Sequence, residues 1–514
     1  MGLFPGAGAL NKKKQFLQAL AGILCLIVGA AIALYSSRRY SERRYIVDAA
    51  SCRMDLMVVN RGDLPTNPET GSVVLLHGIS ANRIIMQYLA RSFAELGLTV
   101  YVPDLPGHGR SPGPFTPEQA ETCSASLLRG LAARGMVVPG RTILAGHSMG
   151  GAIAIRIAEK FRPAGVIAIS PAPMQPDHGV IPENLLFHNL PQVVPNTRIL
   201  AAQFEPKGLR DNAADLAAGS GDPSVQFTLV PLNTHVSMLF STTVARESQA
   251  WASRVLSLRN DARLPWRVNI LGCLLGLVGI LLLGGPFIRE MTGKETRPDL
   301  EAGNIPSRLR GAVEVVLLSV FALNVLHFWQ PLRVLHLFEG DYLASFFLIV
   351  GLGLILLHYR LVRTQFRTLP SVLFGAAFAA ILLHFLITGW FELTATGAWL
   401  TLQRWERFPL FFLATFLFLH GVELLAGPVA DGRTRYGFWL LLAVLAWLAL
   451  AFGVLYLKSG EILLVLLSPY FALQFVLSGL GTQLVRRQTG SATAAALFGA
   501  ILLAGFCLVL FPLS

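Results

Sequence analysis

Charged residues are scarce in this chain, and acidic residues are scarcer than basic ones. Only 14% of the 514 residues are Asp, Glu, Lys or Arg, whereas 53% are hydrophobic, and the mean hydropathy is +0.56. A typical soluble domain contains about 25% charged residues, so this composition excludes a protein that is soluble throughout its length. A large part of the chain is therefore expected to lie in lipid.

Basic residues outnumber acidic ones, but the sequence does not point to nucleic acid. The chain has 42 Lys and Arg against 30 Asp and Glu, a net charge of +12. Nucleic-acid binding would need a basic face with stacking aromatic residues on a soluble module, and no such segment is visible. The charge fits basic rims that are attracted to anionic lipid headgroups. Membrane lipids are therefore the expected partners.

Cysteines are few, and neither repeats nor low-complexity segments stand out. Three of the five cysteines, Cys25, Cys273 and Cys507, fall in apolar segments. Cys52 and Cys123 fall in the more polar part of the chain, where a disulfide is possible outside the cytoplasm but is not implied. The cysteine content therefore leaves the redox compartment open.

Apolar segments of membrane-spanning length begin near the N-terminus. A span needs about 20 apolar residues, and the first such segment is 16–35, preceded by three lysines and followed by Arg38, Arg39, Arg43 and Arg44. No persuasive small-residue cleavage site precedes these arginines, so we expect a retained anchor rather than a signal peptide. Residues 1–15 would then form a short cytoplasmic N-terminus.

A second group of apolar segments fills the C-terminal half. After a linker at 259–267, spans recur near 268–288, 311–330, 342–359, 371–391, 408–427, 436–457, 461–481 and 492–513. These eight segments predict an all-α polytopic transmembrane domain over 268–513. With the N-terminal anchor, the chain would cross the membrane nine times.

Loop charge predicts the orientation of these spans. If residues 45–258 lie outside the cytoplasm, the cytoplasmic loops carry twelve basic residues: Arg289, Lys294, Arg297, Arg308, Arg310, Arg360, Arg363, Arg367, Arg433, Arg435, Arg486 and Arg487. The opposite loops carry four: Arg333, Arg404, Arg407 and Lys458. The arginines at 38–44 and 254–267 oppose this orientation, but long translocated domains count for less in the rule. We therefore expect a protein of the cell (inner) membrane whose soluble domain and C-terminal Ser514 are extracytoplasmic.

Polar residues inside the expected spans form one candidate for function. His420 and Glu423 are three positions apart and share a helix face, and ionisable groups at membrane depth are costly enough to be functional hypotheses by default. A metal or proton site is one interpretation, and a hydrogen-bonded contact between helices is the other. The second is favoured because no transporter or intramembrane protease motif is present, and no metal or cofactor is assigned.

The motif Gly146-His147-Ser148-Met149-Gly150 carries the most specific chemistry. It lies between a strand-like apolar run and a helix-like segment. A serine on so sharp a strand-to-helix turn has its hydroxyl exposed, and the flanking glycines are needed because larger side chains would clash. The pattern predicts a nucleophile elbow with Ser148 as the nucleophile. His147 occupies a variable position and is assigned no role.

Three further segments accompany this motif. Residues 72–80 form a predicted buried strand that runs into a His-Gly turn, and residues 100–111 form a second strand followed by Gly-His-Gly-Arg-Ser. Residues 226–235 form another strand that ends in His235. The order of these signals along the chain makes the central motif far more specific than it would be alone.

With these segments the chain resembles the α/β-hydrolase family, in particular the branch of monoglyceride lipases, lysophospholipases and serine aminopeptidases. The resemblance covers roughly residues 45–258. It implies an α/β domain with a mostly parallel sheet flanked by helices, and a chain order of serine, acid, histidine. It also implies an oxyanion hole formed by the backbone N–H groups of Ile79 and Met149.

Catalysis of this kind requires three side chains. A serine hydroxyl is a poor nucleophile until an imidazole takes its proton, and the resulting imidazolium needs a carboxylate. Ser148 and His235 are expected to fill the first and last places. The acid is open: Glu205, closest to the end of a predicted strand at 198–203, is favoured over Asp211 and Asp177.

The expected function is a membrane-anchored serine hydrolase that cleaves a lipid or acyl ester through an acyl-enzyme. Where the resembled lipases carry a helical cap, this chain has only a short proline-rich segment. An open site is therefore expected, which would suit an acyl chain presented from lipid. The alternatives are an acyltransferase or peptidase with the same triad, or a transporter or scaffold that carries a degenerate hydrolase domain.

Overall fold

The chain folds into two compact units. The computed structural model describes residues 12–49, 52–64, 68–172, 192–259, 261–266, 268–292, 306–365, 368–427, 432–457 and 461–514. The sheet unit consists of Ile32–Ile270, Phe391–Thr401 and Val509–Ser514, and the helical unit of Met1–Ala31, Leu271–Trp390 and Leu402–Leu508. The sheet unit therefore contains two short segments from the C-terminal half of the chain.

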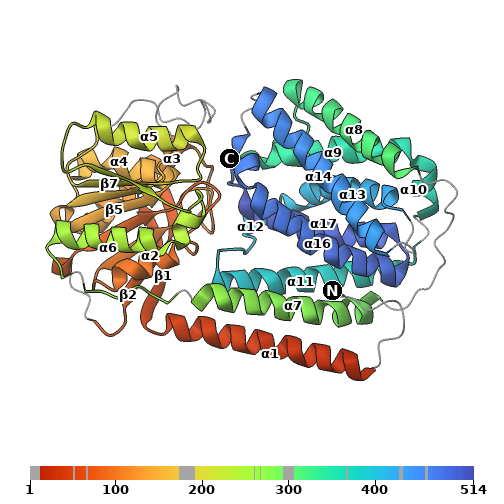
Figure 1. Ribbon diagram of the computed structural model, residues 1–514, viewed down its shortest axis with the longest axis horizontal. Helices are drawn as coiled ribbons and strands as arrows, with labels where there is room; N and C mark the ends of the chain where they lie inside the picture. Colours follow the sequence, from red (N-terminus) through yellow and green to blue (C-terminus); the bar gives the residue numbers. More distant parts are fainter. Residues whose placement is uncertain are drawn as a thin grey trace. The chain divides into compact units, whose positions relative to one another are not determined.

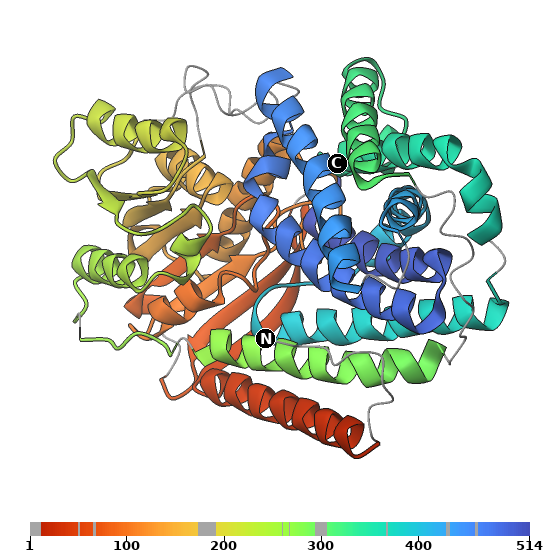
Figure 2. The same ribbon diagram turned by 45° about the vertical axis from the view of Figure 1, so that its right-hand side comes forward.

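An eight-stranded sheet forms the centre of the sheet unit (Figures 1 and 2). Its order is β1-β2-β4-β3-β5-β6-β7-β8. The strands are β1 (Tyr40–Ala49), β2 (Cys52–Arg61), β3 (Ser72–Leu76), β4 (Thr99–Pro103), β5 (Thr142–His147), β6 (Gly165–Ile169), β7 (Thr197–Ala202) and β8 (Gln226–Val230). The pairs β1–β2 and β2–β4 are antiparallel, whereas β3 to β8 run parallel. The first strand begins before Tyr45, where the domain was expected to start.

Helices cover both faces of this sheet. One face carries α3 (Pro117–Ala133), α4 (Met149–Phe161) and α5 (Lys207–Gly219), and the other carries α2 (Gln87–Ala94) and α6 (Thr242–Leu256) (Figure 1). The central strands are apolar runs because both their faces are covered: every residue of β3 is buried. The predicted α/β architecture with a mostly parallel sheet is confirmed. Since the carboxyl ends of parallel strands share one edge, the loops after β3, β5, β7 and β8 meet there.

The turn between β5 and α4 contains the central motif of the sequence. Ser148 has φ 54° and ψ −120°, a conformation that non-glycine residues rarely adopt. A β-carbon on Gly146 would lie 2.2 Å from the carbonyl oxygen of Gly150, and one on Gly150 would lie 2.3 Å from the carbonyl oxygen of Leu76. The backbones are therefore too close for any side chain at either glycine.

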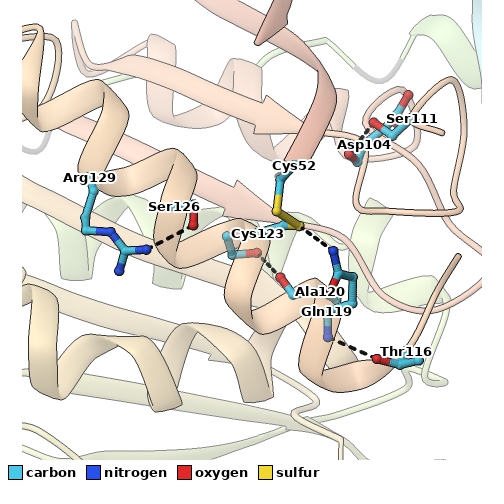
Figure 3. Close-up of a disulfide and its surroundings, with 10 residues drawn as sticks. Cys52, Asp104, Ser111, Thr116, Gln119, Ala120, Cys123, Ser126 and Arg129 are labelled. Atoms are coloured by element: carbon cyan, nitrogen blue, oxygen red, sulfur yellow. Dashed lines mark hydrogen bonds between the residues drawn. A yellow bond between two sulfur atoms is a disulfide. The ribbon is translucent and has the colours of Figure 1, made fainter. Parts of the chain in front are cut away.

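A disulfide ties the β1–β2 hairpin to the helical layer. Cys52, the first residue of β2, is bonded to Cys123 of α3, with the two α-carbons 5.5 Å apart (Figure 3). The helix begins at a capping residue, Thr116, whose hydroxyl accepts a hydrogen bond from the Gln119 N–H at 3.0 Å. The sequence did not determine whether these two cysteines pair, and in the structure they form a disulfide.

The two C-terminal segments of the sheet unit bond directly to its loops. The Leu513 N–H donates to the Gly107 carbonyl at 3.0 Å, and the Phe115 N–H donates to the Leu513 carbonyl at 2.5 Å. The segment Phe391–Thr401 is joined by hydrogen bonds to Asn82. The structure therefore differs from the expected domain boundary at 268–513, which left both segments out of the sheet unit.

Most of the long apolar helices belong to the helical unit. The helices outside the α/β layers are α1 (Lys12–Ser37), α7 (Val268–Thr292), α8 (Arg308–Phe328), α9 (Gly340–Leu357), α10 (Tyr359–Gln365), α11 (Pro370–Thr394), α12 (Leu402–Trp405), α13 (Phe408–Leu425), α14 (Gly432–Leu457), α15 (Ile462–Leu466), α16 (Ser468–Thr489) and α17 (Ala492–Leu510). Within the described residues, eight are long and apolar enough to cross a membrane: α1, α7, α8, α9, α11, α13, α14 and α17. The expected span at 461–481 is not among them, because the chain there forms the short α15 and then the more polar α16.

Buried polar side chains link α13, α14 and α16. Glu423 forms an ion pair with Arg435, which also donates to Gln483 Oε1 at 2.6 Å. The Arg486 Nε lies 3.9 Å from the same carboxylate. Among the described residues, no group of three or more His, Cys, Asp or Glu side chains is arranged to hold a metal ion. The contacts of Glu423, which shares a helix face with His420, are thus those of a helix–helix interface.

Replacing Gly150 by alanine should destabilise the sheet unit, because the new β-carbon would overlap the Leu76 carbonyl. Overpacking of this kind costs about 1–3 kcal/mol, and more where backbone must move. We expect the thermal unfolding midpoint of the detergent-purified protein to fall by roughly 4 °C or more. The control is Gly140→Ala, where no atom lies within 4 Å of the added carbon. Equal midpoints for the two variants would contradict this account of the turn.

Candidate active site

Ser148 lies at the carboxyl edge of the sheet, against the loop that follows β3. Its N–H donates to the Ile169 carbonyl at 2.9 Å, and the residue is 9% exposed. A β-carbon on Gly78 would lie 3.0 Å from the Ser148 β-carbon. Residues 77–84, called here the β3 loop, therefore contact Ser148 without an intervening side chain.

A buried histidine fixes the start of the β3 loop. The Nδ1 of His77 donates to the Gly78 carbonyl at 2.8 Å, and its Nε2 accepts from the Leu105 N–H at 2.9 Å. Burial lowers the pKa of the His77 imidazole, so the ring stays neutral, as this pair of bonds requires. His77 thus bonds loop backbone on both of its nitrogens.

A buried carboxylate holds the β3 loop to the loop after β4. Asp104 accepts from the Arg83 N–H at 2.7 Å and from the Arg110 N–H at 2.9 Å, and it forms an ion pair with the Arg83 guanidinium. That guanidinium also lies 3.3 Å from Asp55 Oδ1. Buried charges are tolerated when they are paired and hydrogen-bonded in this way. The network therefore fixes two loops at the edge where Ser148 lies.

The loops after β7 and β8 bring a carboxylate to a histidine. His235 Nδ1 lies 2.9 Å from Glu205 Oε1, and the Glu205 side chain is fully buried. The two loops are also joined through backbone, because the Phe204 N–H donates to the Asn233 carbonyl at 2.9 Å. The structure thus pairs the expected base with the acid favoured from the sequence.

Of the other two candidate acids, Asp211 does not make this contact. Asp211 lies within α5 and is only partly buried, and the hydrogen bonds of the described residues do not join it to His235. Asp177 lies outside the described residues, as does most of the proline-rich segment expected to form a short cap. Glu205 is therefore the acid that the geometry favours.

His147, to which the sequence gave no role, contacts His235. Its Nε2 donates to the His235 carbonyl at 2.9 Å, and the centres of the two rings lie 4.7 Å apart. Burial, together with the neighbouring His235, lowers the pKa of His147 to about 3. The only sequence signal was that a histidine, and not a smaller residue, occupies the second position of the elbow.

His147, the residue before Ser148, is the described link between the Ser148 turn and His235. A β-carbon on Gly78 would lie 3.1 Å from the Nδ1 of His147, so the His147 ring lies between the β3 loop and His235. No direct hydrogen bond between the Ser148 hydroxyl and the His235 ring is formed among the described residues. Catalytic hydrogen bonds are often long without substrate and tighten in the Michaelis complex.

Known proteins resemble the part of the chain that carries this site. Residues 73–285 match the family model described as "Alpha/beta hydrolase family". The lipase LipV of Mycobacterium tuberculosis is 34% identical over 118 residues, which make up 23% of this chain and 40% of that lipase. The chain therefore aligns with less than half the length of this relative.

Solved structures of hydrolases also match. A thermophilic esterase from Thermogutta terrifontis is 20% identical, with 42% of this chain and 99% of that chain covered and a TM-score of 0.32. A monoacylglycerol lipase from Paleococcus ferrophilus is 18% identical, with 40% and 99% covered and a TM-score of 0.31. Residues 73–285 thus match an α/β-hydrolase family model, and the parallel sheet with the sharp turn at Ser148 has the α/β-hydrolase fold.

Proposed function

We propose that the sheet unit is a serine hydrolase that cleaves an acyl ester, with Ser148 as nucleophile, His235 as base and Glu205 as the supporting acid. The observation that carries the proposal is the 2.9 Å contact between His235 Nδ1 and Glu205 Oε1, at the same sheet edge as the Ser148 turn. A carboxylate in this position holds the imidazole so that its Nε2 is the free, proton-accepting nitrogen.

The reaction would proceed in two halves. The Ser148 Oγ attacks the ester carbonyl carbon while His235 Nε2 takes the hydroxyl proton, and the carbonyl π electrons move to the oxygen. The tetrahedral intermediate expels the alcohol, which receives the proton from His235, and leaves an acyl group on Ser148. Water then attacks this acyl group, again giving its proton to His235, and the acid is released as Ser148 regains its hydrogen.

Two backbone N–H groups, of Met149 and Ile79, would stabilise the oxyanion. Met149 is the first residue of α4, so its N–H has no acceptor within the helix and lies at the positive end of the helix dipole. Ile79 follows Gly78, which contacts Ser148. Donors fixed in advance where negative charge develops are typically the largest single contribution to such catalysis.

His147 would support the base without competing for its proton. Its hydrogen bond to the His235 carbonyl fixes the backbone that carries the catalytic ring. Because its pKa lies near 3, it remains neutral at physiological pH, so it adds no repulsion when His235 becomes an imidazolium. His147 is in this proposal a positioning residue.

An ester with an acyl chain is the substrate class that the surroundings favour. Large apolar side chains stay exposed beside the proposed acid and base: Phe204 at 59%, Leu232 at 82% and Val236 at 44%. An apolar rim of this kind suits an acyl chain. The lipases and esterases among the relatives, and the long apolar helices of this chain, agree with a lipid or lipid-like ester.

We also propose that α16 crosses the membrane, so that the chain crosses it nine times, as expected from the sequence. Phe391–Thr401 and Val509–Ser514 both belong to the sheet unit, so an even number of crossings must separate them. Helices α13, α14 and α17 alone would give three. With 22 residues, α16 is long enough for a hydrocarbon core of about 30 Å, and its polar residues Gln474, Ser478, Thr482, Gln483 and Arg486 are buried inside the protein.

The disulfide favours an extracytoplasmic sheet unit. Structural disulfides persist outside the cytoplasm and are rare inside it, and Cys52–Cys123 joins two elements of this unit. This orientation is also the one expected from the distribution of basic residues among the loops.

The nucleophile is tested by Ser148→Ala. Removing the hydroxyl should lower the turnover of a p-nitrophenyl acyl ester by about 10⁴-fold or more, because no group remains to form the acyl-enzyme. The thermal unfolding midpoint should stay close to that of the unmodified protein. Turnover that survives the substitution would rule out the proposed enzyme.

The acid is tested by comparing Glu205→Gln with Asp211→Asn. We expect the first to lower kcat by about 10³- to 10⁴-fold, because an amide cannot stabilise the His235 imidazolium. The second should leave kcat within about twofold, the range of most substitutions that touch no functional group. The reverse pattern would identify Asp211 as the acid.

The orientation is tested with single cysteines in intact cells. The background variant lacks the free thiols Cys25, Cys273 and Cys507 and keeps the disulfide. A membrane-impermeant maleimide should label Gly140→Cys and Ser514→Cys directly, but Arg360→Cys only after permeabilisation. If only Arg360→Cys were labelled in intact cells, the orientation would be the opposite of the one proposed. If positions 140 and 514 were found on opposite sides of the membrane, α16 would not cross it.

A further inference from the structure

Asn82, in the β3 loop, is bonded to a segment 314 residues further along the chain. Its Nδ2 donates to Thr396 Oγ1 at 3.0 Å and to the Gly397 carbonyl at 3.2 Å, and its Oδ1 accepts from the Gly397 N–H at 2.9 Å. A fourth bond, from the Ile84 N–H to Oδ1 at 3.1 Å, stays within the loop. The buried amide thus joins the β3 loop to Phe391–Thr401 with all of its polar atoms.

The packing at this contact is tight. A β-carbon on Gly397 would lie 3.1 Å from the Cγ and Oδ1 atoms of Asn82 and 3.3 Å from its Nδ2. A β-carbon at position 397 would therefore require the Asn82 amide to shift by a few tenths of an ångström, and a larger side chain would displace it further. The contact depends on glycine at that position.

An ion pair provides a second link between the same segments. Arg110 donates to Glu392 Oε1 at 2.7 Å, and Glu392 Oε2 accepts from the Ala398 N–H at 3.1 Å. The backbone of Arg110 is itself bonded to Asp104, the carboxylate that also binds the backbone of Arg83, next to Asn82. The segment is therefore linked to the β3 loop twice, directly at Asn82 and through Arg110 and Asp104 at the neighbouring Arg83.

We infer that Phe391–Thr401, carried at the C-terminal end of α11, positions the β3 loop for catalysis and that Asn82 is the positioning residue through which it acts. The inference rests on the proposed function, because the group being positioned is the Ile79 N–H of the oxyanion hole. An oxyanion donor is effective only when it is held within a few tenths of an ångström of its productive place. The C-terminal half of the chain thus contributes to a site whose catalytic groups all precede it in the sequence.

The test measures kcat and KM of the full chain with Asn82→Ala and with Gly397→Val. Each should lower kcat by about tenfold or more while KM changes by less than about threefold, because the lost interaction acts in the transition state. Gly437→Ala in α14, where no atom lies within 4 Å of the added carbon, is the matched control and should behave as the unmodified protein. If both variants keep kcat within about twofold of the control, the inference is overturned.

Two milder variants at Thr396 provide the test if Asn82→Ala and Gly397→Val do not fold well enough to be purified. Thr396→Val removes one hydrogen bond at nearly constant shape and should lower kcat by about two- to tenfold, whereas Thr396→Ser should restore it. Equal kcat for the two would overturn the inference.

Ser148→Ala in the same assay separates the two proposals. Turnover that requires Ser148 but not Asn82, Gly397 or Thr396 refutes only the positioning role, whereas turnover independent of Ser148 refutes the proposed function itself.

Discussion

The close approach of three backbone segments around Ser148 is the constraint on which the site depends. The strand β5, the first turn of α4 and the end of β3 meet at distances that exclude a side chain on Gly146 or Gly150. This packing holds Ser148 at a positive φ. It also places the N-terminus of α4 beside the serine, so one turn carries both the proposed nucleophile and a proposed oxyanion donor.

Buried polar contacts hold the residues and loops around this turn. The proposed acid, the His77 ring and the Asp104–Arg83 pair are all buried, and each is bonded to a specific partner. Buried polar networks of this kind fix one arrangement, because any shift leaves a charged or polar group without a partner. The segment Phe391–Thr401 joins this network at Asn82 and Arg110. A domain encoded in the first half of the chain is thus completed by residues of the second half.

Sequence patterns predicted the elements that depend on local chemistry. The parallel strands were visible because burial on both faces makes them uninterrupted apolar runs. Glu205 was favoured from its place at a strand end, although its contact with His235 also depends on the loop after β8. The roles of His147 and Asn82 depend on partners that only the tertiary fold brings close. The expected span at 461–481 had wrong bounds, because the chain there divides into α15 and α16 and the buried polar residues of α16 continue to Thr489. Cysteine spacing carried no information on the disulfide.

Mapping a covalent adduct tests the central claim most directly. A fluorophosphonate mimics the tetrahedral intermediate and reacts with a serine that an adjacent base has activated. After treatment of the purified full chain, peptide mass spectrometry should find one phosphonyl group, on the peptide that contains Ser148, and ester hydrolysis should be lost in proportion to its occupancy. An adduct on a different serine, or undiminished hydrolysis when Ser148 is fully modified, would contradict the account.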